Sequence, residues 1–152
     1  MHHRLPRKAV RLVVVGALLA AAGAAVAAEP DKARPLALRK IMQDLGTNMQ
    51  RITDGISRED WETVARIAPA IGEHPQPPLV EKMRILKFAG SDAGKFKGYD
   101  EKTHTAAQAL QQAAQRGDGR AVIAAFATLQ NTCLACHESF RKPFVEHFYG
   151  ER

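Results

Sequence analysis

The residue types best suited to chemistry in this 152-residue chain stand together near its C-terminal end, as Cys133-Leu134-Ala135-Cys136-His137. Two thiols three residues apart, followed at once by an imidazole, form the Cys-x-x-Cys-His pattern that attaches a c-type haem. The thiols can add across the two vinyl groups of a porphyrin, and the imidazole can ligate its iron. On a helix this spacing places all three side chains on one face, as one flat cofactor requires. The sequence therefore predicts one covalent haem c on Cys133 and Cys136, with His137 as an axial ligand of the iron.

Three other uses of this motif have to be weighed, because the chain has only two cysteines and both stand here. A redox dithiol of the thioredoxin type is expected within an α/β pattern, and no such pattern surrounds the motif. A structural zinc site needs four ligands, usually with a second pair at similar spacing, which His104 and His147 do not form. A simple disulfide in a haem-free helical protein stays open as a third class of function.

The first 28 residues predict a secretory signal peptide. A basic start precedes an apolar run from Leu12 to about Ala25, and Val26-Ala27-Ala28 is a suitable cleavage site before Glu29. An uncleaved membrane anchor is the competing interpretation, but the run is short for a spanning helix and alanine-rich towards its end. We therefore expect export to the periplasm, with residues 29–152 as the mature domain and no membrane span within it.

The net charge argues against a nucleic-acid partner. The formal charge is +6, but the signal segment holds four basic residues and no acid. Its removal leaves 18 basic against 16 acidic residues, a net charge of only +2, which is no electrostatic footprint for nucleic acid. Because the sequence shows no acid/base pair, nucleophile constellation or phosphate-binding loop, we do not expect an enzyme.

A regular apolar seam predicts the first helix. Its members recur at steps of three and four residues, as in a bundle helix; they are Leu38, Met42, Leu45, Met49, Ile52 and Ile56. Asp54-Gly55 predicts the end of this helix. Ser57 with Asp60 resembles a capping box that opens a second helix. Pro69 should kink this second helix, and Gly72 should end it.

The second half of the chain predicts two further long helices. The prolines of residues 75–78 exclude regular helix, and a short helical piece at 79–88 precedes a glycine-rich loop at 89–98. Asp100 should cap a third helix, which reaches about Arg116 before Gly117-Asp118-Gly119 breaks the chain.

The last helix carries the haem motif on its apolar stripe, and Pro143 should end or bend it. Residues of this stripe are Val122, Phe126, Leu129, Cys133, Cys136, His137, Phe140 and Phe144. Four amphipathic helices and no convincing strand predict an all-α protein, an antiparallel four-helix bundle with covalently attached haem c. We expect Trp61 in the core, and His74, His104 and His147 at the surface.

The motif Cys133-x-x-Cys136-His137-x-x-Phe140-Arg141 on the last helix resembles the class II c-type cytochromes, the cytochrome c′ family. Residues 39–49 are similar to the first-helix pattern of its low-spin branch, in which a Met four residues before a Gly ligates the iron. The resemblance implies His137 as the proximal and Met42 as the distal ligand. It also implies haem-pocket or propionate contacts, for which the candidates are Arg39, Leu45, Met49, Phe140 and Arg141.

The residues alone support Met42 less strongly than His137. Methionine on a helix seam more often fills the core than binds a metal, and Met49 and Met83 are rivals for the same role. Family members with Leu or Phe at the position of Met42 have five-coordinate iron and an apolar pocket for small gases.

An iron with His and Met ligands has no open position, so the main expectation is a periplasmic one-electron carrier that meets redox partner proteins. The alternative is a five-coordinate protein of the cytochrome c′ type that binds gases such as nitric oxide. Because relatives often pair through their first two helices, a homodimer is compatible with either function.

Overall fold

The computed structural model describes residues 35–150. The predicted signal peptide, 1–28, therefore lies outside the described residues. Within them every regular element is helical, and none of these helices combines the length and the apolar character that a membrane span requires. The predicted all-α class is confirmed.

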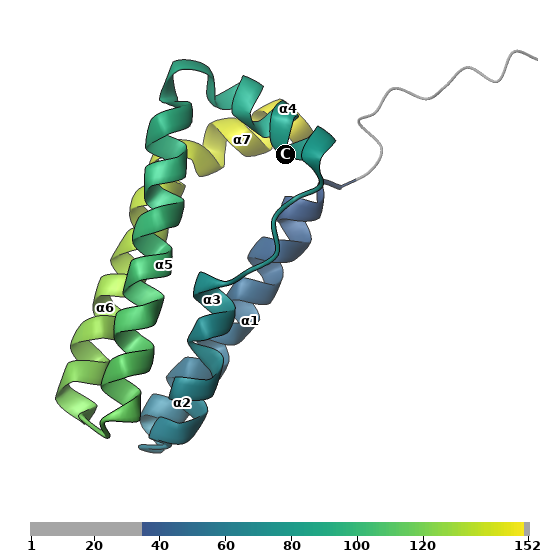
Figure 1. The fold of residues 1–152 in the computed structure, drawn as a ribbon. Helices are drawn as coiled ribbons and strands as arrows, with labels where there is room; N and C mark the ends of the chain where they lie inside the picture. Colours follow the sequence, from purple (N-terminus) through teal and green to yellow (C-terminus); the bar gives the residue numbers. More distant parts are fainter. Residues whose placement is uncertain (1–34, 151–152) are drawn as a thin grey trace, which may run out of the picture.

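Four helical arms form the bundle, joined as Figure 1 shows. The arms are α1 (Ala37–Ser57), α2 (Trp61–Ile67) continued by α3 (Pro69–Gly72), α5 (Ala93–Gln115) and α6 (Gly119–Cys136). α1 and the α2–α3 arm lie together on one side, and the α5–α6 hairpin forms the other. The predicted antiparallel four-helix bundle is confirmed, and so is the interruption at Pro69, which lacks the N–H that would continue α2.

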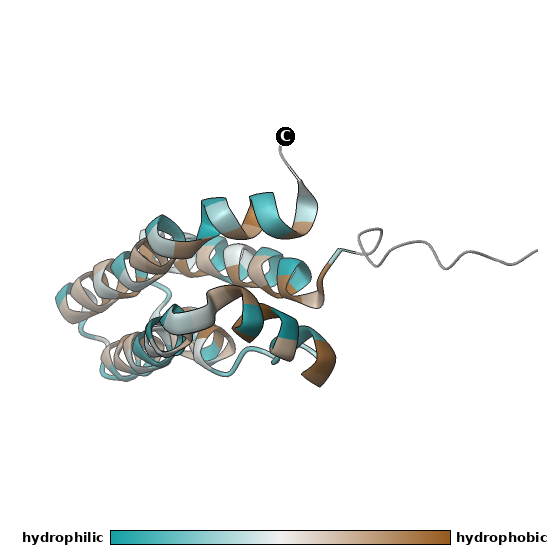
Figure 2. Ribbon diagram, turned by 90° about the horizontal axis from the view of Figure 1, so that it is seen from above, coloured by the Kyte–Doolittle hydropathy of each residue, from teal (hydrophilic) through white to brown (hydrophobic). Residues whose placement is uncertain are grey.

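Two short helices cover the open end of the bundle. They are α4 (Leu79–Ala89), which occupies the long connection after α3, and α7 (Lys142–Tyr149), which follows α6. Figure 2 views the molecule from this end, with polar and apolar stretches alternating along the helices. Aromatic side chains join the two helices, because the Phe88 ring lies 5.5 Å from Phe144 and 5.6 Å from Phe148, centroid to centroid.

All four arms contribute to the core, which lies between the α5–α6 turn and the middle of the bundle. Its largest fully buried side chains are Ile52, Val64, Ile71, Leu110, Val122 and Leu129. Burying one such side chain contributes roughly 1.5–3 kcal/mol. Trp61 packs at the edge of this core, as predicted.

The junction of α1 and α2 corrects two predictions. α1 continues through Asp54-Gly55 to Ser57, and Gly55 is buried where a Cβ would lie only 3.0 Å from Val64. Glycine therefore permits the close approach of the helices here and does not end the helix. The cap of α2 is Asp60, whose carboxylate accepts a hydrogen bond from the Thr63 amide at 3.0 Å, while Ser57 bonds back to Thr53 within α1.

The predicted glycine-rich loop at 89–98 is wrong beyond its first residues. Only a single 3-10 turn, Gly90–Asp92, separates α4 from α5, which begins at Ala93 and includes Gly94 and Gly98. Each helical glycine costs about 1 kcal/mol relative to alanine, an amount that the packing of a long helix exceeds. Asp100 consequently lies inside α5 and does not cap it.

The start of α1 is held by a residue from α4. Leu36 offers no capping side chain, and the carboxylate of Glu81 instead accepts hydrogen bonds from the amides of Ala37 and Leu38, each at 2.8 Å. A carboxylate at a helix N-terminus satisfies free N–H groups and complements the helix dipole. Glu81 thereby fixes the first turn of the helix that carries Met42.

Candidate functional site

The predicted haem-attachment residues lie where α6 ends. Cys133 and Cys136 occupy its last turn, are half-buried and are free thiols. His137 follows as the first residue of a π-helical turn, His137–Arg141, and is exposed. The helix thus presents two thiols and an imidazole within one turn, as the motif predicts.

The π turn has a local cause in Pro143. Proline has no N–H to donate to the carbonyl four residues earlier, and its ring crowds that carbonyl. The helix accommodates this by widening over five residues before α7 resumes at Lys142 and turns away from the line of α6 (Figure 1). The prediction that Pro143 bends the helix is confirmed.

Burial and a neighbouring charge determine the protonation of the three motif side chains. Burial raises the pKa of both Cys133 and Cys136, so the thiols stay protonated and poorly reactive as nucleophiles. Partial burial lowers the pKa of His137, and the positive charge of Arg141 lowers it further. His137 therefore favours the neutral imidazole, the form that can ligate a metal.

Contacts with α5 fix the position of the motif. The hydroxyl groups of Thr103 and Thr132 are 3.1 Å apart just before it, and those of Tyr99 and Ser139 are 3.1 Å apart just after it. Phe140 is buried, with its ring centroid 5.2 Å from that of Phe96. These contacts hold the turn with His137 against α5 from both sides.

The apolar seam of α1 is covered only in part. Leu45 and Met49 pack against the core, whereas Met42, one turn closer to the start of the helix, is 42% exposed. α1 and α6 meet near the beginning of α6 and diverge towards the end that bears Cys133 and Cys136 (Figure 1). Two half-buried thiols and a neutral imidazole fit a large apolar group such as haem, and the exposed part of Met42 is apolar surface at the same end of the bundle.

Of the remaining predicted contacts, Arg141 lies on the π turn with His137, whereas Arg39 is engaged elsewhere. The guanidinium of Arg39 lies over the Tyr149 ring, 5.6 Å from its centroid, and Arg141 is exposed and acts on His137 through its charge. Met83, the distant rival of Met42, is 59% exposed on α4. Arg39 is thus engaged with α7 in this structure.

The predicted surface position is wrong for His74, holds only in part for His104, and is confirmed for His147, which is exposed. His74 and His104 lie together with Asp100 inside the molecule's polar network, and the His74 side chain is only 7% exposed. His147 packs on Phe88, 5.1 Å between ring centroids. The spacing of Asp100 and His104, four residues apart on one helix, was a usable signal, but no pattern indicates that His74 joins them from 26 residues away.

Comparison with known proteins supports one family. A family model described as Cytochrome C′ matches residues 86–141, about a third of the chain, which include the whole Cys133–His137 motif. Cytochrome c′ of Pararhodospirillum photometricum is 40% identical over 63 residues, covering 41% of this chain. The chain spans about half the length of that relative. The comparisons therefore support a class II c-type cytochrome, with covalent haem c and its iron as the cofactor.

Proposed function

We propose that this chain is a c-type cytochrome that holds one haem through Cys133, Cys136 and His137 and binds small gases such as nitric oxide. When bound, the group supplies an iron that can exchange one electron and coordinate a small molecule at an open position. The observation that carries the proposal is the placement of two half-buried thiols and a neutral imidazole on one turn. This turn lies at the end of the bundle where the apolar stripe of α1 is uncovered.

Each motif residue has a distinct part in this proposal. Cys133 and Cys136 anchor the group by thioether bonds, and the bracing contacts from Tyr99 and Thr103 keep their helix in place. His137 offers a neutral nitrogen because its pKa is lowered, so its ligation does not require a proton to leave at neutral pH.

The comparisons favour gas binding over pure electron transfer, since the family model and the relative from Pararhodospirillum photometricum are both described as cytochrome c′. The competing candidate is the one-electron carrier with Met42 as sixth ligand. One observation favours this carrier, because Met42 continues the apolar seam of α1 and is 42% exposed rather than packed in the core. Under either function we propose that the protein is exported to the periplasm and meets redox partners there.

An absorption spectrum of the haem-loaded protein, oxidised, reduced, and reduced under carbon monoxide, tests the proposal. A broad reduced band that shifts with the gas would support an open distal position. Sharp, split reduced bands that the gas does not move would instead indicate six-coordinate iron and the carrier function. No haem spectrum from a host that matures c-type cytochromes would refute both.

The variant Met42→Leu examines the sixth ligand directly. If Met42 ligates the iron, its loss should turn the spectrum high-spin and gas-reactive; gas binding at an already open position predicts an unchanged spectrum. Met83→Leu is the matched control, because Met83 is an exposed methionine on another helix. A spectral change shared by both variants would show that the effect is not specific to Met42.

A further inference from the structure

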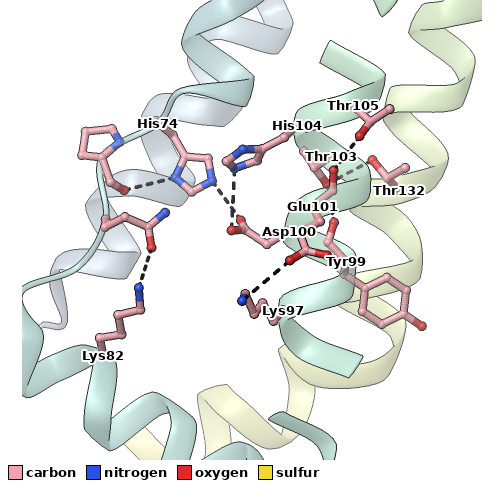
Figure 3. A network of polar contacts seen from close by, with 12 residues as sticks. His74, Lys82, Lys97, Tyr99, Asp100, Glu101, Thr103, His104, Thr105 and Thr132 are labelled. Carbon is pink, nitrogen blue, oxygen red and sulfur yellow. Dashed lines mark hydrogen bonds and ion pairs between the residues drawn. The ribbon is translucent and has the colours of Figure 1, made fainter. Parts of the chain in front are cut away.

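His74, Asp100 and His104 form a compact group of metal-ligating side chains that the haem motif does not use. His74 belongs to the connection between α3 and α4, and the other two lie one turn apart on α5 (Figure 3). The His74 Nε2 atom is 3.0 Å from one oxygen of Asp100, and the His104 Nε2 atom is 3.6 Å from the other. All three ligating atoms lie within 4.8 Å of one another.

The hydrogen bonds of His74 leave both of its ring nitrogens facing acceptor oxygens. Its Nδ1 is 3.1 Å from the Pro75 carbonyl oxygen, which can only accept, so Nδ1 carries the proton. In the neutral ring Nε2 then has a lone pair, and that lone pair faces a carboxylate oxygen of Asp100, another acceptor. Either a second proton or a metal ion must lie between them. Metal-ligating histidines commonly donate their other ring N–H to a backbone carbonyl in this way.

His104 supplies an independent sign of an absent partner. Its Nε2 atom is buried and has no hydrogen-bond partner among the described residues, because 3.6 Å to Asp100 is too long for a hydrogen bond. A buried polar atom without a partner costs about 1–3 kcal/mol. A bound cation would relieve this cost.

The three side chains are close enough together to converge on a small divalent ion. Ligands 2.0–2.2 Å from a tetrahedral Zn²⁺ lie roughly 3.3–3.6 Å from one another. The distances of 3.0 and 3.6 Å run from the two imidazoles to the two different oxygens of Asp100, and one atom from each residue falls within 4.8 Å of the others, so modest side-chain rotation brings the three together round an ion. The side chains of Asp100 and His104 are 39% and 38% exposed, which leaves an entry path from solvent. The positive charge of Lys82 also acts on Asp100 and would compete with a bound cation for its carboxylate.

We propose that His74, Asp100 and His104 bind a divalent transition-metal ion, with Zn²⁺ as the best fit and water as the fourth ligand. Two imidazole nitrogens and one carboxylate oxygen are typical zinc ligands, and three protein ligands leave one position open. The ion would tie the connection between α3 and α4 to the middle of α5.

Isothermal titration of the haem-loaded full chain with Zn²⁺ alone tests the proposal, using protein purified without a histidine tag. We expect one equivalent to bind. His74→Gln, Asp100→Asn and His104→Gln each remove one ligand and should weaken binding about tenfold or more. His147→Gln is the matched control and should bind as the wild type does, because His147 packs on Phe88 away from the three ligands. Absence of one-equivalent binding, or full binding in the three variants, would overturn the proposal.

A stability measurement keeps the test decisive if one variant folds poorly. Zn²⁺ should raise the melting temperature of the wild type and of His147→Gln, and a chelator should reverse the rise. Variants of the three ligands that keep the wild-type haem spectrum and helicity should show no rise. If Asp100→Asn lowers the melting temperature without Zn²⁺ and the wild type binds none, the three residues form only a structural tie.

Discussion

Gly119, the first residue of α6, should not tolerate a methyl group. A Cβ at this position would lie 2.9 and 3.2 Å from two atoms of the six-membered ring of Trp61. The first distance is shorter than packed carbon atoms allow, so the indole must move. This contact packs the start of α6 against the start of α2. The contact therefore fixes the turn of the α5–α6 hairpin, at the opposite end of α6 from the haem motif.

Two opposing effects determine how much Gly119→Ala changes the free energy of unfolding. Overpacking by one methyl group costs about 1–3 kcal/mol, and replacing glycine by alanine in a helix returns at most about 1 kcal/mol. Gly119→Ala should therefore destabilise the protein by about 1–2 kcal/mol. Trp61→Phe removes the part of the indole that Cβ would meet. In that background the same change should be neutral or slightly stabilising, which implies a coupling free energy of about 1–3 kcal/mol.

Guanidinium unfolding of the haem-loaded single and double variants, followed by far-UV circular dichroism, measures this coupling. Gly94→Ala is the control, because a Cβ there meets nothing within 4 Å. The free energy of unfolding of Gly94→Ala should not fall below that of the wild type. The haem spectrum should stay unchanged in all variants, since the contact lies at the opposite end of α6 from Cys136. Equal destabilisation by Gly119→Ala in both backgrounds would refute the steric argument.

Three further predictions concern helix ends and the core. Glu81→Ala should cost about 1 kcal/mol or more, because the amides of Ala37 and Leu38 lose their acceptor, and hydrogen exchange at those amides should accelerate. Hydrogen bonds from Thr63 lower the pKa of Asp60 below its ordinary value near 3.8. The ionised cap therefore stabilises the folded protein fully above pH 3.8, and this stabilisation is lost as the pH falls through the lowered pKa. Asp60→Asn should keep the cap but remove this acid sensitivity, measured as the melting temperature of both proteins against pH. Leu110→Ala should destabilise by about 2–5 kcal/mol in guanidinium unfolding because Leu110 is fully buried; a loss under 1 kcal/mol would contradict the core described here.

The sequence predicted the arms of the bundle better than their boundaries. Pro69 and Gly117-Asp118-Gly119 interrupt helices as local chemistry requires, because a missing N–H or a left-handed turn acts without help from the rest of the fold. Gly55 and Gly98 misled the same reasoning. Their glycine signals are weak, and tertiary packing decides whether the helix continues through them.

The residues of the candidate site could likewise be predicted only where local sequence determines their position. Cys133, Cys136 and His137 are adjacent in sequence, so their joint placement needs only one helical turn. The pairing of His74 with Asp100 depends on how the connection after α3 lies along α5, which no local pattern encodes. Polar neighbours in the sequence suggested a surface histidine, whereas the fold buries its side chain.

The seam of α1 shows what a periodic pattern does and does not report. Steps of three and four residues indicate that one face of a helix is shielded from water, whatever shields it. Ile52 is fully buried by protein, but Met42 continues the same stripe and stays 42% exposed. Leaving a large apolar side chain in water forgoes roughly 1.5–3 kcal/mol, so such a stripe favours a further apolar partner. We expect a haem attached to the divergent end of α6 to supply that partner, and the exposed fraction of Met42 should then fall when the haem is in place.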